Sequence, residues 1–250
     1  MISRKSREQI ALMRRAGKVV AEMHEVCVRA AVPGATTSAL DRAARAVLDR
    51  RAARSNFLGY HGFPAVVCTS PNDVVVHGIP SDDVVLQEGD IISIDCGAII
   101  EGWHADAAIT VAVGEVDERS KRLLDTTRRS LEAAIDQVEE GNRLGDIGAA
   151  VEGLAEAAGF SVVREYVGHG IGTAMHEDPQ IPNYGPAGRG LKLKEGHVLA
   201  IEPMVNVGRP ETDVLADGWT VVTRDHSRSA HFEHTIAVTE HGPEVLTLPW

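Results

Sequence analysis

The stretch "GDIISIDCGAIIEGWHADAAITVAV" (residues 89–113) decides the fold, because it holds two apolar runs joined by Glu101-Gly102. Ile, Val and Ala dominate both runs, which predicts the two strands of an antiparallel hairpin. Side chains alternate between the two faces of a strand. A two-residue loop therefore places Asp95 and Asp106 one diagonal step apart on the same face. A bulge in either strand would break this parity.

Both aspartates sit where a half-buried side chain is expected. Asp95 follows Ile94, and Asp106 stands between Ala105 and Ala107. Buried like charges repel each other and lose hydration, which costs several kcal/mol per ion unless the charge is compensated. Protons or metal ions are the usual compensating species.

Helices are predicted before this hairpin. The segment 6–31 opens with Ser6 and Gln9 in the spacing of a capping box, and its apolar residues recur at helical intervals. A second helix follows, capped by Thr37 or Ser38. Four apolar segments then predict strands, near 64–69, 73–79, 90–100 and 103–113.

The same order recurs in the second half of the chain. A helix is predicted from about Glu118 to Glu140, then a stop at Gly141, a second helix, and strands from Phe160 onward. This favours one α+β domain over residues 1–250, with two similar halves of approximately 1–113 and 114–250. The alternative is that two helical pairs share a spacing by chance. At an offset of 107 residues, Gly34 matches Gly141, Leu40 matches Ile147, Ala44 matches Val151 and Val47 matches Leu154.

The composition excludes several classes of protein. A formal net charge of −11 argues against a surface that follows a nucleic-acid backbone, and the basic cluster 42–54 is interpreted as a solvated helix face. The N-terminus carries a charge every few residues, so no secretory signal is expected, and no apolar run is long enough to span a membrane. Cys27, Cys68 and Cys96 lack CxxC spacing, which indicates reduced thiols in a cytoplasmic protein.

Two further carboxylates and one histidine complete a candidate metal-ligand set. Glu202 ends an apolar strand, Glu233 lies inside another, and His169 is flanked by glycines. Together with Asp95 and Asp106 they supply oxygen ligands and one imidazole but no thiolate, which suits Mn, Fe, Co or Zn in a catalytic site. Four carboxylates around one divalent ion would leave a net charge of about −2, so the set predicts two divalent ions with a bridging hydroxide.

Competing motifs do not fit. "MHEDPQ" is not HExxH, because Gln180 replaces the second histidine and Pro179 opposes a helix. "VGHGIG" lacks the Lys-Ser/Thr of a phosphate-binding loop and the spacing of a dinucleotide fingerprint. No G-x-S-x-G of a serine hydrolase is present.

The order Asp95, Asp106, His169, Glu202, Glu233 resembles the metal-ligand series of the methionine aminopeptidase family, type I. The resemblance covers nearly the whole chain and implies a pita-bread fold, with pseudo-twofold-related αβ halves and a central antiparallel sheet around a dinuclear metal cleft. The matching stretches are "GYHGFPAVVCTSPNDVVVHGIP" (59–80), "EGDIISIDCGAIIEGWHADAA" (88–108), "GHGIGTAMHEDPQIPNY" (168–184), "EPM" (202–204) and "HFEHTIAVT" (231–239).

The resemblance also implies a role for each site residue. Asp95 would chelate one metal, Asp106 and Glu233 would bridge both, and His169 and Glu202 would complete the second. A metal-bridging water is the expected nucleophile. Glu202 would carry its proton to the leaving nitrogen, and His176 would stabilise the developing oxyanion. His77 would contact the scissile amide or the residue after methionine.

An apolar pocket for the methionine side chain is implied by position, as is a structural monovalent cation. Three pocket residues depart from the commoner pattern of relatives: Phe57 near the rim replaces cysteine, Phe63 replaces tyrosine and Met175 replaces phenylalanine. All three stay apolar, so a preference for methionine should survive. The expected pocket is Tyr60, Phe63, Cys68, Met175 and Trp219, and the expected cation site is Asn72, Val74 and Ser229.

The implied function is removal of the N-terminal initiator methionine from nascent proteins and peptides, with preference for a small second residue. We expect a cytoplasmic monomer that works near the ribosome but binds neither nucleic acid nor membrane. Aminopeptidase P and prolidase share the ligand series, but they usually carry a separate N-terminal domain and a histidine upstream of the GHG motif. Neither is seen here. A non-catalytic homologue would typically lose ligands, and the step from Glu202 to Glu233 is too short for the type II insertion.

Overall fold

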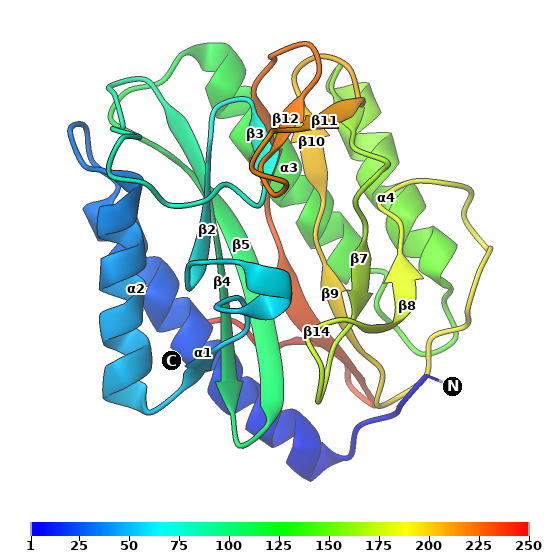
Figure 1. Ribbon diagram of the computed structural model, residues 1–250. Helices are drawn as coiled ribbons and strands as arrows, with labels where there is room; N and C mark the ends of the chain where they lie inside the picture. The colour runs from blue at the N-terminus through cyan, green and yellow to red at the C-terminus, as the bar shows by residue number, and fades with distance from the viewer. Residues whose placement is uncertain (1, 250) are drawn as a thin grey trace.

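The computed structural model describes residues 2–249, in which helices lie behind a layer of strands (Figure 1). Helices α1 (Arg7–Ala30) and α2 (Thr37–Arg51) cover the strands of the first half, and α3 (Glu118–Ile135) and α4 (Leu144–Ala157) cover those of the second. A short 3-10 turn, η1 (Tyr60–Gly62), lies in front of the strands. Among residues 2–249, no helix is long and apolar enough to cross a membrane.

The first helix begins where the sequence predicts. Ser6 caps it, and Ser6 and Gln9 form the reciprocal bonds of a capping box. The predicted cap of the second helix is wrong, because the N-cap is Thr36, whose side chain makes no capping bond. The loop at residues 81–84 takes over this role. Its carbonyl oxygens accept hydrogen bonds from the backbone N–H groups of Thr37 and Ser38.

The predicted hairpin forms the centre of the first sheet. Strands β4 (Ile91–Ile100) and β5 (Trp103–Ala112) pair without a bulge, Asp95 opposite Ala108 and Gly97 opposite Asp106. Glu101 and Gly102 both have positive φ, 50° and 83°, as a two-residue hairpin turn of matching twist requires. The two aspartates therefore share one face. Strand β2 (Val67–Pro71) pairs with β4, as does β1 (Arg54–Ser55).

The second half supplies a five-stranded sheet and most of two smaller ones, one of which also contains a strand from the first half. The large sheet has the order β15 (Gly242–Val245), β14 (His234–Thr239), β9 (Val198–Ile201), β7 (Gly168–Gly170) and β8 (Glu177–Ile181). It meets the first sheet where Ala108 and Glu233 exchange backbone hydrogen bonds of 3.3 and 2.8 Å. One small sheet has the order β13 (Ser229–His231), β10 (Met204–Asn206) and β6 (Ser161–Val162). The other has the order β11 (Thr212–Val214), β12 (Val221–Thr223) and β3 (Val74–Val76).

The third helix is shorter than predicted. It ends at Ile135 instead of Glu140, because the chain tightens there into turns with three-residue hydrogen bonds, such as Val138 N–H to the Ile135 oxygen. This bend buries the Val138 side chain in the core of the second half. Helix α4 buries Ile147 and Val151 as predicted, whereas Leu154 is only half-buried.

Backbone contacts recur at the offset of 107 residues. The N–H of Gly34 bonds to the Leu86 oxygen, and the N–H of Gly141 bonds to the Leu193 oxygen, at 2.8 and 3.1 Å. The isolated bridge between Thr36 and Val85 recurs between Arg143 and Lys192. We propose on this basis that residues 1–113 and 114–250 are the two halves of a single domain, as the sequence pattern suggests.

Two helix glycines give opposite stability predictions. A Cβ at Gly17 in α1 would lie 2.1 Å from the backbone oxygen of Leu246, whereas a Cβ at Gly153 in α4 meets nothing within 4 Å. We expect Gly17→Ala to lower the free energy of unfolding by about 1–3 kcal/mol through overpacking. Gly153→Ala should stabilise it by about 0.5–1 kcal/mol through helix propensity. Urea unfolding measures both, and an equal effect of the two substitutions would contradict the close approach of α1 to the C-terminal segment.

Candidate metal centre and substrate cavity

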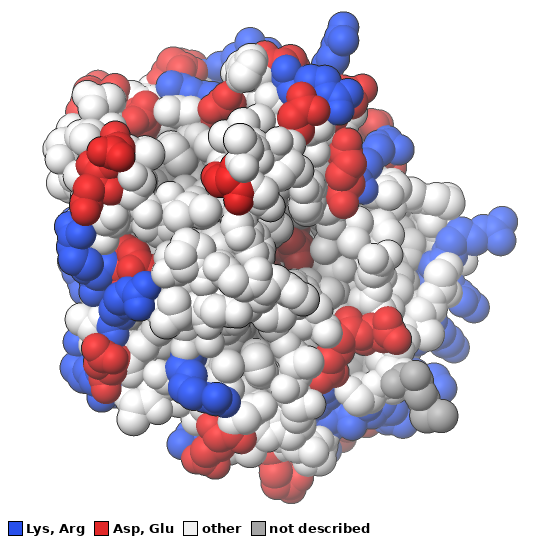
Figure 2. Space-filling view, viewed as in Figure 1, with Lys and Arg blue, Asp and Glu red and all other residues white. Residues whose placement is uncertain are grey.

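All five predicted ligands line one cavity of about 120 Å³. Asp95 comes from β4, Asp106 from β5 and His169 from β7, while Glu202 and Glu233 directly follow or precede strands β9 and β14. Figure 2 shows acidic atoms at the bottom of a hollow near the middle of the front face, surrounded by uncharged surface. Residues separated by more than 130 positions thus meet at the junction of the two halves.

The repeat brings matching carboxylates into this cavity. Strands β4 and β9 begin at Ile91 and Val198, which are 107 residues apart, and the same offset relates Asp95 to Glu202. Each half then contributes a second carboxylate from the neighbouring strand region, Asp106 in the first and Glu233 in the second. Each half therefore presents a pair of acidic side chains to the other.

The four carboxylates are buried (Asp106, Glu233) or half-buried (Asp95, Glu202), without compensating cations from the protein. Neither Lys nor Arg is among the described residues that line the cavity. Burial, reinforced by the neighbouring carboxylates, raises the pKa values of Asp95, Glu202 and Glu233 well above their ordinary range, and burial raises that of Asp106 to about 7. One oxygen of Asp95 and one of Asp106 have no hydrogen-bond partner. Such a site calls for bound cations.

His169 is oriented as a metal ligand. Its Nδ1 lies 2.9 Å from the carbonyl oxygen of Gly170, which can only accept a hydrogen bond, so Nδ1 carries the proton. Nε2 is left with a free lone pair, 3.5 Å from Glu202 Oε1. Burial lowers the pKa of His169 to about 4, which keeps the ring neutral. Ligand atoms of Asp106, His169 and Glu233 all lie within 4.8 Å of one another, so these residues fit a divalent metal ion.

The other wall of the cavity is apolar. Phe63 packs edge-on against Trp219 with ring centroids 5.1 Å apart, and Cys68 lies opposite Asp95 in the strand pairing. Phe57, expected near the rim, is only 7% exposed and belongs to the apolar cluster that forms this wall. The cluster is Phe57, Phe63, Ala65, Cys68 and Met175, with Tyr60, Ile79 and Trp219 packed against it.

Both predicted non-ligand histidines line the same cavity. His77 has a positive φ of 60°, and its ring faces those of Tyr166 and Trp219 at 5.7 and 6.3 Å. Burial lowers the pKa of His77 to about 4. His176 stands at the mouth, with its ring centroid 4.3 Å from that of His169, and burial together with the nearby His61 lowers its pKa also. Both rings are therefore neutral at neutral pH.

Two site residues escaped the sequence analysis. His231 is 2% exposed, and its Nε2 lies 3.9 Å from Glu202 Oε2 without a hydrogen-bond partner. It stands two residues before Glu233, so strand alternation was the available signal. Glu177 accepts hydrogen bonds from Ser3, Lys5 and the backbone of Thr173, and it thereby holds the loop that carries His176. No sequence signal joins residues so far apart.

Two of the three residues expected to hold a monovalent cation are joined through the backbone. The N–H of Ser229 donates to the carbonyl oxygen of Asn72 at 2.8 Å, and Asn72 has a positive φ of 53°. Val74 begins the adjacent strand β3.

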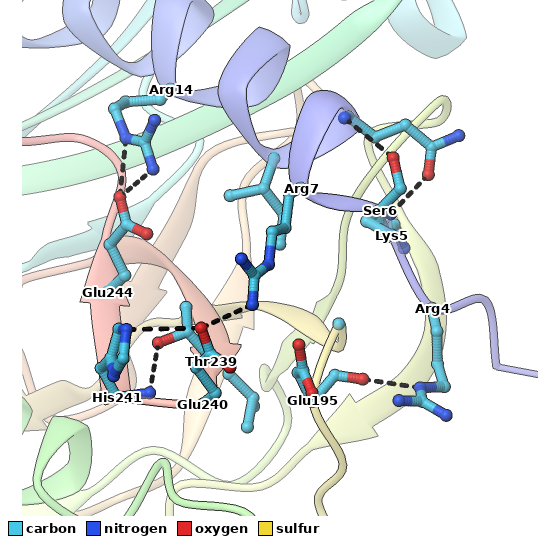
Figure 3. Close-up of a pocket in the computed structure, with 14 residues that line it drawn as sticks. Arg4, Lys5, Ser6, Arg7, Arg14, Glu195, Thr239, Glu240, His241 and Glu244 are labelled. Atoms are coloured by element: carbon cyan, nitrogen blue, oxygen red, sulfur yellow. Dashed lines mark hydrogen bonds and ion pairs between the residues drawn. The ribbon is translucent and has the colours of Figure 1, made fainter.

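A larger cavity of about 720 Å³ lies elsewhere, between the start of α1 and the turn of β14–β15 (Figure 3). Several of its charged groups have partners: Arg7 pairs with Glu240, Arg14 pairs with Glu244, and Arg4 donates to the Glu195 carbonyl oxygen. Unlike the acidic cavity, it presents no cluster of buried, unpaired ligand atoms.

Comparison with known proteins places this chain in a family. A model described as metallopeptidase family M24 matches residues 11–240. The chain belongs to metallopeptidase family M24. A methionine aminopeptidase of Clostridium acetobutylicum is 50% identical over 248 residues, covering 99% of each chain. The crystal structure of a methionine aminopeptidase from Thermotoga maritima matches with a TM-score of 0.97 at 47% identity, covering 99% of this chain and 100% of that one.

The predicted resemblance to the methionine aminopeptidases and the pita-bread fold are thereby confirmed, and the protein is a metallopeptidase. A prolidase from Pyrococcus furiosus also matches, with a TM-score of 0.79 at 20% identity, covering 99% of this chain and 66% of that one. That likeness extends to the fold alone.

Replacing Asp106 by Asn isolates one buried carboxyl group. The pKa of Asp106 rises from 3.8 to about 7 on folding, so without metal its contribution to stability is full below pH 3.8 and is lost as the pH rises to about 7. Asn binds no such proton. In the presence of a chelator, Asp106→Asn should therefore gain stability relative to the unsubstituted protein across this range. Urea unfolding at a series of pH values measures the difference, and a constant difference would contradict the raised pKa.

Proposed function

We propose that this protein removes N-terminal methionine from nascent proteins and peptides whose second residue is small. The observation that carries the proposal is the composition of one cavity, in which an anionic ligand set faces an apolar, sulfur-containing pocket. The first suits a hydrolytic metal centre, and the second suits an unbranched thioether side chain. The relatives named methionine aminopeptidase support the same activity.

Two divalent ions are the proposed cofactor, with Co, Mn, Fe or Zn as candidates. Asp95 would hold one ion, Asp106 and Glu233 would hold both, and His169 and Glu202 would hold the other. Four carboxylates withdrawn from water support this number, because two divalent charges balance them and one does not. When bound, such ions lower the pKa of a water molecule, bind a free amine and polarise a carbonyl group.

The protein's own groups would then move protons and stabilise charge. Glu202 accepts the proton of the attacking water and passes it to the leaving nitrogen, a role supported by its burial and raised pKa. His176, neutral at the mouth of the cavity, donates a hydrogen bond to the oxyanion that develops on the scissile carbonyl. His77 contacts the scissile amide or the residue after methionine.

Tyr60, Phe63, Cys68, Met175 and Trp219 would surround the methionine side chain, and Phe57 is expected to narrow their pocket. Burial raises the pKa of the Cys68 thiol far above its ordinary value, so it would serve as a neutral wall of the pocket and not as a nucleophile. Asn72, Val74 and Ser229 are proposed to hold a monovalent cation that braces β3 against β13. We further propose a cytoplasmic monomer that meets its substrates near the ribosome without binding nucleic acid.

One paired assay tests this function. The protein loaded with Co, Mn, Fe or Zn is expected to release methionine from Met-Ala-Ser, because the ligand set and the pocket share one cavity. Chelation should abolish the release, and Asp106→Asn should lower it by at least about 100-fold while its circular dichroism stays unchanged.

The same assay also tests for a proline-specific peptidase. Turnover of an Xaa-Pro peptide with no release of methionine from Met-Ala-Ser would replace this proposal with a proline-specific peptidase. A chain that binds Met-Ala-Ser but cleaves neither peptide with any of the four metals would be a non-catalytic peptide-binding protein.

A further inference from the structure

We propose that Tyr60 is a positioning residue whose hydroxyl donates a hydrogen bond to Nδ1 of His176 and so fixes the proton of this imidazole on Nε2. The inference rests on the proposed function, in which His176 donates a hydrogen bond to the oxyanion. It gives Tyr60 a task that its ring, as part of the apolar pocket, does not require.

The contact joins two distant parts of the chain. Tyr60 lies in η1 and His176 lies 116 residues later, just before β8, yet Tyr60 Oη and His176 Nδ1 are 2.7 Å apart. Their ring centroids are 5.4 Å apart at 60°, so the rings also pack against each other. Among residues 2–249, no other group hydrogen-bonds to the imidazole of His176.

The direction of this hydrogen bond follows from the chemistry of the two groups. In a neutral imidazole one ring nitrogen carries a proton and the other accepts a hydrogen bond. A phenol hydroxyl is a good donor, and the lone pair of a neutral imidazole is a strong acceptor. Tyr60 therefore donates to Nδ1, which leaves the proton on Nε2. Without this bond, the two tautomers of an exposed histidine would both be populated.

The turn that carries Tyr60 is held in place before substrate binds. Backbone hydrogen bonds join Gly59 to Phe63 and Tyr60 to Phe57, at 2.8 and 2.9 Å. The Ser55 hydroxyl accepts from the N–H groups of Phe57 and Leu58. The His61 ring packs edge-on against Tyr60 with centroids 4.4 Å apart. The hydroxyl is thus aimed at His176 by a preorganised turn.

His169 and His176 are consequently oriented in opposite senses. The Gly170 carbonyl oxygen fixes the proton of His169 on Nδ1 and leaves Nε2 free to bind metal. Tyr60 leaves a proton on Nε2 of His176, which makes this nitrogen a donor toward substrate. One acceptor and one donor thus give two packed imidazoles, 4.3 Å apart, the two different tasks of the proposed reaction.

Tyr60→Phe removes the hydroxyl and keeps the ring. Nitrogen-15 NMR of the metal-free protein, with the His176 signals assigned by their loss in His176→Ala, reports which nitrogen is protonated. The unsubstituted protein should show protonated Nε2 and unprotonated Nδ1, and Tyr60→Phe should show a mixture of both tautomers. A proton on Nδ1 in the unsubstituted protein, or the same tautomer in both proteins, would overturn the proposal.

A double-mutant cycle on Met-Ala-Ser separates this role from pocket lining. Tyr60→Phe should lower kcat about tenfold, less than the loss of a whole oxyanion donor, with KM changed by less than about twofold. In the His176→Ala background it should have no further effect. Phe63→Leu changes a residue of the same pocket that makes no side-chain hydrogen bond. It should instead raise KM, and its effect on kcat/KM should multiply with that of His176→Ala. Multiplicative losses for Tyr60→Phe would show that Tyr60 only lines the pocket.

Failure of the two proposals is distinguishable. If the unsubstituted protein releases no methionine, the proposed function fails while the NMR comparison still decides the tautomer. If methionine is released but the unsubstituted protein and Tyr60→Phe show the same His176 tautomer, only the proposed role of Tyr60 fails.

Discussion

Four carboxylates withdrawn from water repel one another in a single cavity, and this repulsion shapes the chemistry of the whole site. Asp95, Asp106, Glu202 and Glu233 line a cavity that no described Lys or Arg reaches, and burial raises the pKa of each. A protein with such a cluster stays folded only when the carboxylates bind protons or cations, and the two cases have different chemical consequences. Protons would make the cavity inert at low pH. Divalent cations would make it a hydrolytic centre.

The two-part αβ architecture explains how one chain brings these carboxylates together. Each half has its own apolar core, in which a helical pair packs on a sheet. Burial of apolar side chains in these two cores offsets the destabilisation caused by the acidic residues at the junction. The junction lies where β5 meets the Glu233 segment, so the ligands stand on strands fixed from both sides. His169, Tyr60 and His176 then refine the site through single hydrogen bonds to ring nitrogens.

Local rules made much of this predictable from the sequence. The parity of Asp95 and Asp106 follows from strand alternation and a two-residue turn, and the Ser6 capping box follows from one spacing. The helix ends failed where distant segments compete. The loop at 81–84 replaces a side-chain cap for α2, and the burial of Val138 ends α3 early. His231 could have been found from strand alternation with Glu233, whereas the contact between Tyr60 and His176 joins two remote segments, which no local pattern encodes.

The number of divalent ions bound per chain shows whether the carboxylates form a dinuclear metal centre. Titration of the metal-free protein with Mn²⁺ or Co²⁺, followed by calorimetry and by metal analysis after gel filtration, measures this number together with the protons released. We expect two ions per chain and a net release of protons at pH 6 to 7, because carboxyl groups of raised pKa must ionise to bind metal. A chain that binds no divalent ion, or that binds ions without releasing protons, would contradict this expectation.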